Sequence, residues 1–385
     1  MSHLAVAMSG GVDSAVAAAL LVEEGHSVVG LTMNLWPAWL PEPDDAFRAC
    51  CGVTAIGDAR AVAQQLGIRH YVLNLREEFE RAVIDEFVDE YARGRTPNPC
   101  IACNRAIKFS LLLRKVQAMG LEGLATGHYA RVRYDEARER YLLLRGRDPV
   151  KDQSYVLFGL TQGQLGRLRF PVGEHTKAEI RTVARRLGLR VADKADSQEI
   201  CFIPRGHYAD LVAQRRPEAA RPGPILDRIG RQVGTHNGVG RFTIGQRRGL
   251  GLSAGQPRYV TGIDPGRNAV VVGEAQDLLA AEVTARQLNW IGGTVPPEPL
   301  RVTARVRHGA RETSALAWVE AAGTLRVRFD DPQRAAAPGQ AVTLYQGEIV
   351  IGGGIIETAH ALDGAVGAGG SATDPSSMEV NRHAG

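Results

Sequence analysis

The first half of the chain alternates short apolar runs with helical patterns, and this order constrains the fold more than any other feature of the sequence. The alternating segments are the apolar runs 4–8, 27–33, 70–75 and 123–126 and the helical patterns at about 13–24, 54–66 and 77–91, with a further helix after Cys103. Repeated strand–helix–strand units predict a parallel sheet that is covered by helices on both faces. In such sheets, ligand sites lie beyond the carboxyl ends of the strands.

The second half of the chain follows a different pattern. Residues 222–261 are rich in Gly and Arg with short apolar pieces, which predicts a compact β-rich module. After about residue 280, the runs LRVTARVR, TLRVRFD, QAVTLYQ and EIVIGGGII are separated by turn residues, a pattern typical of a small antiparallel barrel. From about residue 363 the chain is rich in Gly, Ala and Ser without periodicity, and we predict a disordered tail.

These patterns divide the chain into four parts: an α/β domain at 1–206, a central β-rich module at 207–278, a β-barrel at 279–361 and the tail at 362–385. The length of 385 residues agrees with several domains, because single cores rarely exceed roughly 250–300 residues. No apolar run reaches the roughly 20 residues that a membrane helix needs, and the start MSHLAVAMSGG has no basic leader. We therefore expect a cytoplasmic protein with no membrane partner.

The charge is unevenly distributed along the chain. The whole sequence has a formal net charge of +4, but residues 131–190 hold 14 Lys and Arg against 7 Asp and Glu. A basic stripe of this kind suits an anionic partner such as a nucleic acid. A solvated helix face with many ion pairs has a similar composition, so charge alone leaves both interpretations open.

The hexapeptide SGGVDS at 9–14 stands where the first predicted strand ends and a helix begins. Two glycines allow a tight bend, and backbone N–H groups, the helix N-terminus and two hydroxyls favour a bound phosphate or pyrophosphate there. Asp13 suits Mg²⁺ or helix capping better than direct phosphate contact. The loop lacks the lysine of the Walker pattern, which argues against ordinary γ-phosphate transfer. An ordinary strand–helix turn is the alternative for this motif alone.

Five cysteines, Cys50, Cys51, Cys100, Cys103 and Cys201, raise the question of what their thiols do. A structural zinc site usually needs four ligands, whereas the chain offers one CxxC pair and Cys201, so zinc is disfavoured. For the adjacent Cys50 and Cys51 we favour buried, inert thiols. For Cys103 and Cys201 we favour covalent sulfur chemistry, since a thiolate can carry a sulfane sulfur that a second thiol releases by forming a disulfide.

Eight motifs occur in one order along the chain: SGGVDS, ACCG with DARAVAQQLGI, TPNPCIACNRAIKF, ATGHYAR, KDQSY, SQEICFIP, FTIGQRRGLG and GQAVTLYQGEIVIGGGII. This set resembles the bacterial tRNA-specific 2-thiouridylases over nearly the whole chain, up to about Leu362, and SGGVDS resembles the loop of the pyrophosphatase-loop ATPases. The resemblance implies an N-terminal parallel-sheet, adenine-nucleotide α-hydrolase-like domain for ATP binding and catalysis. A small β-rich central module and a C-terminal antiparallel β-barrel that binds tRNA would follow.

The resemblance further implies an ATP-dependent transferase that cleaves ATP between its α and β phosphates. It would adenylate the C2 carbonyl oxygen of the wobble uridine in tRNAs for Lys, Glu and Gln, releasing pyrophosphate. Sulfur would then replace this oxygen, and AMP would leave. ATP, accompanied by Mg²⁺, would bind through its phosphates at Ala7, Met8, Ser9, Gly10, Gly11, Val12, Asp13 and Ser14, with Met33 and Gly127 beside the adenosine.

The same resemblance assigns the sulfur and tRNA contacts. Cys201 would receive sulfur as a persulfide from an upstream sulfur carrier or cysteine desulfurase, and Cys103 would release it by forming a disulfide with Cys201. The residues implied at the target base or elsewhere on tRNA are Asn98, Pro99, Cys100, His128, Lys151, Asp152, Gln153, Arg307, His308 and Gln340. We expect a monomer.

Two positions depart from the family pattern, and several alternatives stay open. Cys100 stands where some members have Asp, and His308 replaces an expected aromatic residue. Cys100, Cys103 and Cys201 could therefore instead hold a [4Fe–4S] cluster with one iron open to sulfide, whereas the persulfide route needs no such metal site. For His128 the alternative is a purely structural imidazole. A small-molecule adenylating ligase would need no paired cysteines, and a non-catalytic RNA-binding module would not cleave ATP.

Overall fold

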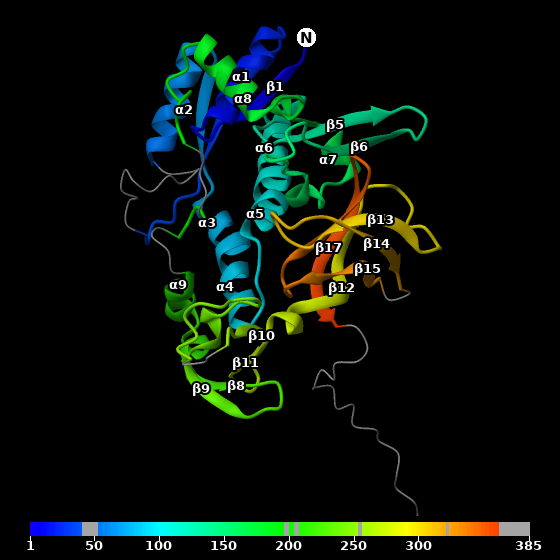
Figure 1. The fold of residues 1–385 in the computed structure, drawn as a ribbon. Coiled ribbons are helices and arrows are strands. Elements are labelled where there is room, and N and C mark those ends of the chain that lie inside the picture. Colours follow the sequence, from blue (N-terminus) through cyan, green and yellow to red (C-terminus); the bar gives the residue numbers. More distant parts are fainter. Residues whose placement is uncertain (41–52, 196–199, 204–207, 253–255, 321–322, 362–385) are drawn as a thin grey trace, which may run out of the picture.

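Five parallel strands form the sheet of the N-terminal domain, as the alternating pattern predicts. The computed structural model describes residues 1–40, 53–195, 200–203, 208–252, 256–320 and 323–361. The sheet order is β3-β2-β1-β4-β7, and every neighbouring pair is parallel. Its strands are β1 (His3–Ala7), β2 (Ser27–Asn34), β3 (Arg69–Asn74), β4 (Gly123–Ala125) and β7 (Leu168–Arg169). Figure 1 shows this domain at the top.

Helices cover both faces of this sheet. They are α1 (Val12–Glu23), α2 (Val53–Gln65), α3 (Arg76–Phe79), α4 (Asp85–Ala92), α5 (Pro99–Ala102), α6 (Leu113–Ala118), α7 (Gln162–Leu165) and α8 (Lys177–Arg186). Leu4 and Val6 of β1 share one hydrophobic cluster with α1 and α8, whereas Ala5 belongs to a second cluster with α4 and α5. Because successive side chains of a strand point to opposite faces, β1 is buried on both.

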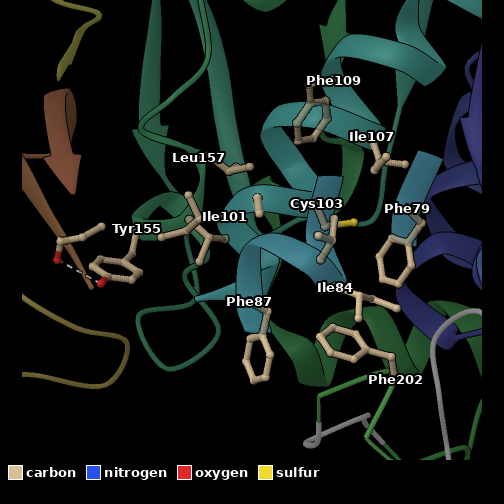
Figure 2. Packing of buried hydrophobic residues seen from close by; sticks show 14 of the residues in the cluster. Phe79, Ile84, Phe87, Ile101, Cys103, Ile107, Phe109, Tyr155, Leu157 and Phe202 are labelled. Carbon is tan, nitrogen blue, oxygen red and sulfur yellow. Dashed lines mark hydrogen bonds between the residues drawn. The ribbon is translucent and has the colours of Figure 1, made fainter. Parts of the chain in front are cut away.

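Two π-helical segments join short helices into longer ones. Glu80–Ile84 connects α3 to α4, and Cys103–Leu112 connects α5 to α6. Figure 2 shows side chains of both stretches packed together, with Phe202 against the first. Segments of π-helix are rare and often occur at functional positions, so the location of Cys103 at the start of one is notable.

The helix predicted after Cys103 begins earlier, at Pro99. Asn98 caps it, because its side-chain oxygen accepts a hydrogen bond from the Cys100 N–H at 3.0 Å. Pro99 occupies the first helical position, where its missing N–H costs nothing. Both cysteines of the CxxC pair therefore lie within one continuous helical stretch.

The central module is a four-stranded sheet attached to α4. Its order is β10-β11-β8-β9, and its strands are β8 (Pro222–Leu226), β9 (Gln232–Asn237), β10 (Tyr259–Asp264) and β11 (Ala269–Gly273). The helix α9 (Tyr208–Arg215) provides the link, since the ring of Tyr208 lies 4.2 Å from that of Tyr91 on α4.

Short 3₁₀ turns connect elements in several parts of the chain. They occur at Ser154–Leu157, Pro171–Glu174, Pro217–Ala220, Val239–Arg241 and Ala275–Leu278.

Six antiparallel strands close the C-terminal barrel. They are β12 (Leu279–Trp290), β13 (Leu300–Arg305), β14 (Thr313–Val319), β15 (Leu325–Arg334), β16 (Ala341–Gln346) and β17 (Ile349–His360). The sequence of pairings β12-β15-β14-β13-β16-β17 is closed by β12 against β17. Closure leaves no free strand edge within the barrel. The predicted fold class of parallel-sheet domain, β-rich module and antiparallel barrel is confirmed.

The structure contains several strands that the sequence pattern did not predict. The hairpin of β5 (Ala130–Asp135) and β6 (Arg140–Arg145) leaves the N-terminal domain and pairs with β17, which extends the barrel sheet (Figure 1). Its sequence ARVRYDEARERYLLLR is dominated by charged residues that obscure the apolar alternation. β12 was missed because LAAEVTARQLNW contains Ala, Glu and Leu residues that equally suit a helix.

Some predictions concern residues that the structure does not describe. Cys50 and Cys51, residues 196–199 of the SQEICFIP motif and the tail at 362–385 lie outside the described residues. The exact domain limits, the disorder of the tail, the monomeric state and the cytoplasmic location stay predictions. Among the described residues, helices that combine the length and apolarity needed to cross a membrane are absent.

Candidate active site

The SGGVDS loop lies at the carboxyl end of β1 and leads into α1. The Ser9 N–H donates to Ser14 Oγ at 3.1 Å, and Ser14 Oγ donates to Gly11 O at 3.1 Å, so the loop is closed by its own serine. Of the side chains that the structure describes, none caps α1 at Gly11. The first N–H groups of this helix are therefore left for another acceptor, and an anion is favoured because the helix dipole adds positive potential.

Two glycines of the site have no room for a side chain. A Cβ on Gly10, whose φ is +66°, would lie 2.3 Å from Ala55 O. A Cβ on Gly127 would lie 2.7 Å from Ser14 N. Gly127 follows β4, and Met33 lies near the end of β2, the two strands that flank β1. The residues predicted to bind ATP thus meet at the carboxyl edge of three adjacent strands.

Two lysines that the sequence analysis did not assign reach this loop. Lys177 opens α8 and places its Nζ 2.8 Å from both carboxylate oxygens of Asp13. Lys194 donates to Gly10 O at 3.0 Å and to Asp58 Oδ2 at 2.6 Å. The lysine that the hexapeptide itself lacks is thus supplied by two distant segments. The sequence offers one weak signal for these two residues, which is that lysine is rare: the chain has five lysines among its 46 basic residues.

Asp13 is held from a second side by Tyr129. The Tyr129 hydroxyl donates to Asp13 Oδ1 at 2.7 Å, and the Tyr129 ring is almost fully buried. The Asp13 side chain nevertheless remains 30% exposed, so a bound ion can reach it. Magnesium usually takes one or two carboxylates and completes its shell with substrate phosphates and water, so Asp13 fits the Mg²⁺ that accompanies ATP.

Cys103 and Cys201 contact the same hydrophobic cluster. Cys103 is buried, and Figure 2 shows its sulfur on the side of Phe79. Cys201 is partly buried against this cluster, and its neighbour Phe202 packs edge-on against Phe79 and Phe87 with ring centroids at 5.8 and 5.3 Å. Two cysteines about a hundred residues apart in sequence therefore adjoin one extended hydrophobic cluster, in which Phe79 packs against Phe202, the neighbour of Cys201.

Cys100 occupies a different environment from Cys103. It is exposed at the start of the helical stretch, where Asn98 accepts its N–H. Within the described part of the chain, no three or more His, Cys, Asp or Glu side chains are grouped so that they could hold a metal ion. In this structure Cys100, Cys103 and Cys201 are therefore not grouped as three ligands of one metal site.

His128 follows Gly127 and is buried in an aromatic environment. Its ring lies 5.5 Å from that of Phe109 and 5.9 Å from that of Phe170, and its Nδ1 is 2.6 Å from Thr126 Oγ1. Burial lowers the pKa of His128 well below its usual value, and the positive charge of Lys108 lowers this pKa further. The imidazole is therefore neutral at physiological pH and offers no positive charge to a nucleotide phosphate.

A pocket of about 220 Å³ opens between α4, the segment before α5 and the barrel. Asn98 and Pro99, two residues predicted at the target base, line it together with Glu90, Arg95 and Gln287. Much of the remaining lining is charged, because Glu86, Arg93 and Arg105 join Glu90 and Arg95 beside the apolar Val83, Phe87, Ile101 and Ala102. The pocket is therefore more charged than a typical small-ligand site, whose walls are mostly apolar with a few polar groups.

The other residues predicted to touch tRNA differ in their surroundings. Arg307 and His308 are exposed on the loop between β13 and β14, and Lys151 is partly exposed. Asp152 is only 6% exposed. Gln153 is partly exposed, and its Oε1 accepts the backbone N–H of Tyr129.

Gln340 links the barrel to the segment that precedes the CxxC pair. Its Nε2 donates to Thr96 O at 2.7 Å, and the Thr96 N–H donates to Pro338 O at 2.7 Å. A Cβ on the intervening Gly339 would lie 2.8 Å from Thr96 N. The turn before β16 therefore holds the backbone next to Asn98 in place.

Many cations of the basic segment 131–190 are paired. Arg147 lies 3.8 Å from Glu179, and Arg145 forms a short ion pair with Glu312 of the barrel. Arg186 lies 2.9 Å from Glu23. For these arginines the interpretation as a surface with many ion pairs therefore holds. The segment has fewer unpaired positive charges than its excess of Lys and Arg over Asp and Glu suggests.

Three family models match consecutive parts of the chain. The "tRNA methyl transferase HUP domain" matches residues 2–205, the "tRNA methyl transferase PRC-barrel domain" residues 209–274, and the "Aminomethyltransferase beta-barrel domain" residues 280–356. The first alone covers more than half of the chain.

Curated relatives match nearly the whole chain under one name, "tRNA-specific 2-thiouridylase MnmA". The relative from Moorella thermoacetica is 53% identical over 92% of this chain and 99% of its own length. The chain belongs to the tRNA-specific 2-thiouridylase family. Family members from Acetivibrio thermocellus and Carboxydothermus hydrogenoformans are 47% and 49% identical, each over 91% of this chain and over 98% and 96% of their own lengths.

Solved structures of low sequence identity also resemble part of this 2-thiouridylase family member. NMN synthetase from Francisella tularensis matches at 17% identity with a TM-score of 0.31, covering 51% of this chain and 66% of that chain.

Proposed function

We propose that the chain is an ATP-dependent tRNA 2-sulfurtransferase that replaces the C2 oxygen of a uridine with sulfur. The identity of 53% with a curated 2-thiouridylase over 92% of the chain carries this proposal. The phosphate loop and the two cysteines on one cluster supply the parts that thiolation through an adenylated intermediate needs. The methyl transfer that two family-model descriptions mention needs neither a pyrophosphate loop nor two thiols.

The first step would join the uridine C2 oxygen to the α-phosphorus of ATP. The bond from the α-phosphorus to the bridging oxygen breaks, and pyrophosphate leaves with the electron pair. Backbone N–H groups of residues 9–14 would hold this pyrophosphate, Lys177 and Lys194 would neutralise it, and Asp13 would hold Mg²⁺. Fixed positive charge stabilises the negative charge that develops on the leaving group.

The second step would use a persulfide on Cys201. Its terminal sulfur attacks C2, and AMP leaves with the original oxygen, so the uridine is linked to Cys201 through a disulfide bond. The Cys103 thiolate then attacks Cys201 Sγ, and the electron pair of the broken bond stays on the sulfur bound to C2. The products are 2-thiouridine and a Cys103–Cys201 disulfide, which a thiol reductant must reduce before the next turnover.

The substrate in this proposal is the wobble uridine of tRNAs for Lys, Glu and Gln. A base in an RNA loop must be splayed out before its carbonyl can reach ATP. The pocket at Asn98 and Pro99 would receive or border this base, while the exposed Arg307 and His308 would contact the tRNA backbone. An upstream sulfur carrier or cysteine desulfurase would load Cys201.

The test is a thiolation assay with purified protein, unmodified tRNA, Mg²⁺-ATP, a thiol reductant and a cysteine desulfurase with its cysteine substrate. We expect 2-thiouridine in the digested tRNA by mass spectrometry, with AMP formed in equal amount. A tRNA with cytidine at the wobble position should remain unmodified. Absence of 2-thiouridine, or a methylated base when S-adenosylmethionine is supplied in place of ATP, would contradict the proposal.

A further inference from the structure

Asp152 of the KDQ motif is turned into the protein, where both of its carboxylate oxygens are engaged. Oδ1 accepts the N–H groups of Gly146 at 3.0 Å and Ser154 at 3.1 Å. Oδ2 accepts the Ser154 hydroxyl at 2.9 Å and lies 3.5 Å from Arg305 Nη1 of the barrel. A carboxylate with this set of donors is a poor candidate for contacting tRNA, whose backbone is also anionic.

The partners of Asp152 in the barrel stand at the two ends of one exposed loop. Arg305 ends β13, and its Nη2 donates to Glu312 Oε1 at 2.7 Å; Glu312 also pairs with Arg145 of β6. The loop between these two residues, 306–311, carries the exposed Arg307 and His308. A tRNA bound on this loop therefore sits directly above a largely buried group of ion pairs.

On its other side the KDQ motif is joined to the ATP loop. The Gln153 N–H donates to Tyr129 O at 2.8 Å, and Gln153 Oε1 accepts the Tyr129 N–H at 3.0 Å. Gly146 packs so closely that a Cβ on it would lie 2.7 Å from Tyr129 O. The Tyr129 hydroxyl then donates to Asp13 Oδ1 at 2.7 Å. A continuous series of contacts therefore leads from Arg305 to Asp13.

We propose that Asp152, Gln153 and Tyr129 are positioning residues that couple tRNA docking on the barrel loop 306–311 to the orientation of Asp13 in the ATP loop. This inference rests on the proposed function, because the docked ligand is tRNA. Closely packed ion pairs and hydrogen bonds can transmit a shift from one site to another. Coupling of this kind is reciprocal, so tRNA and ATP must strengthen each other's binding by the same factor.

The experiment measures this factor directly. The Kd of the Mg²⁺ complex of α,β-methylene-ATP is determined by calorimetry with and without unmodified tRNA, and the Kd of tRNA with and without the analogue. We expect each ligand to tighten the other by roughly fivefold or more in the wild type. In Tyr129→Phe the factor should fall below about twofold, while tRNA binding without the analogue stays unchanged. Tyr134→Phe, which removes an exposed hydroxyl on the neighbouring β5, is the matched control.

A second variant separates positioning from contact. Gln153→Ala removes the acceptor of the Tyr129 N–H, and we expect it to lower the coupling factor with little change in the affinity for tRNA alone. If Gln153→Ala weakens tRNA binding by itself and retains the wild-type factor, Gln153 is a tRNA contact and the inference is wrong. Retention of the wild-type factor in Tyr129→Phe would also overturn it. A wild type that thiolates tRNA without any coupling contradicts this inference alone, whereas a wild type that cannot thiolate tRNA contradicts the proposed function.

Discussion

The Lys177 ammonium lies 2.8 Å from each carboxylate oxygen of Asp13, although the two residues are 164 positions apart. If this cation also stabilises pyrophosphate, Lys177→Gln should weaken binding of Mg²⁺-pyrophosphate by tenfold or more. Hydrogen bonds between charged groups contribute roughly 1.5–3 kcal/mol, and about 1.4 kcal/mol corresponds to a factor of ten. Calorimetry measures the change, with Lys115→Gln on α6 as the control. Unchanged pyrophosphate affinity would remove Lys177 from the site.

Gly127 supplies a test of how closely the strand ends pack. In Gly127→Ala the new Cβ would lie 2.7 Å from the backbone nitrogen of Ser14, so the loop must shift. We expect a loss of roughly 1–3 kcal/mol in stability, as for other overpacked sites, and weaker binding of the ATP analogue. Gly57→Ala is the matched control, because a Cβ at this exposed position of α2 meets no atom within 4 Å. If Gly127→Ala keeps the wild-type melting temperature and the wild-type affinity for the ATP analogue, the contact between residue 127 and Ser14 is not rigid.

Glu312 tests the ion pairs between the barrel and the hairpin. Glu312→Gln leaves Arg145 and Arg305 without their shared carboxylate, and we expect a loss of roughly 2–3 kcal/mol, less than for a fully buried pair. Glu320→Gln removes an exposed partner of Arg326 and should cost less than about 1 kcal/mol. Melting temperatures of the full chain compare the two. Equal shifts would mean that the pair between the barrel and the hairpin contributes no more than a surface pair.

The same carboxylate should make stability depend on pH. Burial alone would raise the pKa of Glu312, but the hydrogen bond and charge of Arg145 outweigh it and the pKa is lowered. Its contribution is therefore complete above the unfolded-state pKa of roughly 4.3 and is lost as the pH falls below that value. The difference in melting temperature between wild type and Glu312→Gln should shrink as the pH is lowered from about 5 to 3. A constant difference would contradict this account.

His128 should make the stability of the protein depend on pH in a higher range than Glu312 does. Because its pKa is lowered by burial, the unfolded chain binds a proton near pH 6.5 that the folded protein does not. The unfolding free energy should therefore fall as the pH drops below about 6.5, by at most about 1.4 kcal/mol per pH unit for this residue. His128→Asn should reduce this slope, whereas His308→Asn at an exposed position should keep it. Melting temperatures of the three proteins measured between pH 7 and 5 give this pH dependence. An unchanged pH dependence in His128→Asn would contradict a lowered pKa of His128 in the folded protein.

The order of helices and strands was predictable where the apolar pattern repeats. Prediction failed where charged residues or alanines obscure that pattern. The strand–helix alternation predicted β1 to β4. The buried strands β1, β2 and β4 are nearly continuously apolar, as in other parallel sheets, whereas the edge strand β3 is largely exposed and was found through the apolar residues of HYVLNL. The hairpin β5–β6 escaped prediction because its strand residues alternate with arginines that pair elsewhere, such as Arg131 with Glu348. Pairing of β6 with β17 depends on side chains some 200 residues apart, which no local pattern contains.

The site was predictable to the extent that its residues lie in short motifs. SGGVDS indicated a phosphate loop, and the structure places Gly127 against it. Lys177 and Lys194 were missed because each reaches the loop only through the fold, from α8 and from the segment after it. The resemblance placed Asp152 on tRNA, yet burial turns it inward, and sequence alone does not reveal which way a polar side chain faces.

We propose that Cys103 and Cys201 transfer the sulfur and that Cys100 takes no part. The most direct measurement is single-turnover thiolation by anaerobically purified wild type and by Cys100→Ser, Cys103→Ser and Cys201→Ser, together with the iron and labile sulfide content of each protein. We predict no iron, near wild-type 2-thiouridine formation in Cys100→Ser, and none in the other two variants. Near-stoichiometric iron that is lost together with activity in all three variants would contradict the persulfide account and make the CxxC helix part of a [4Fe–4S] site.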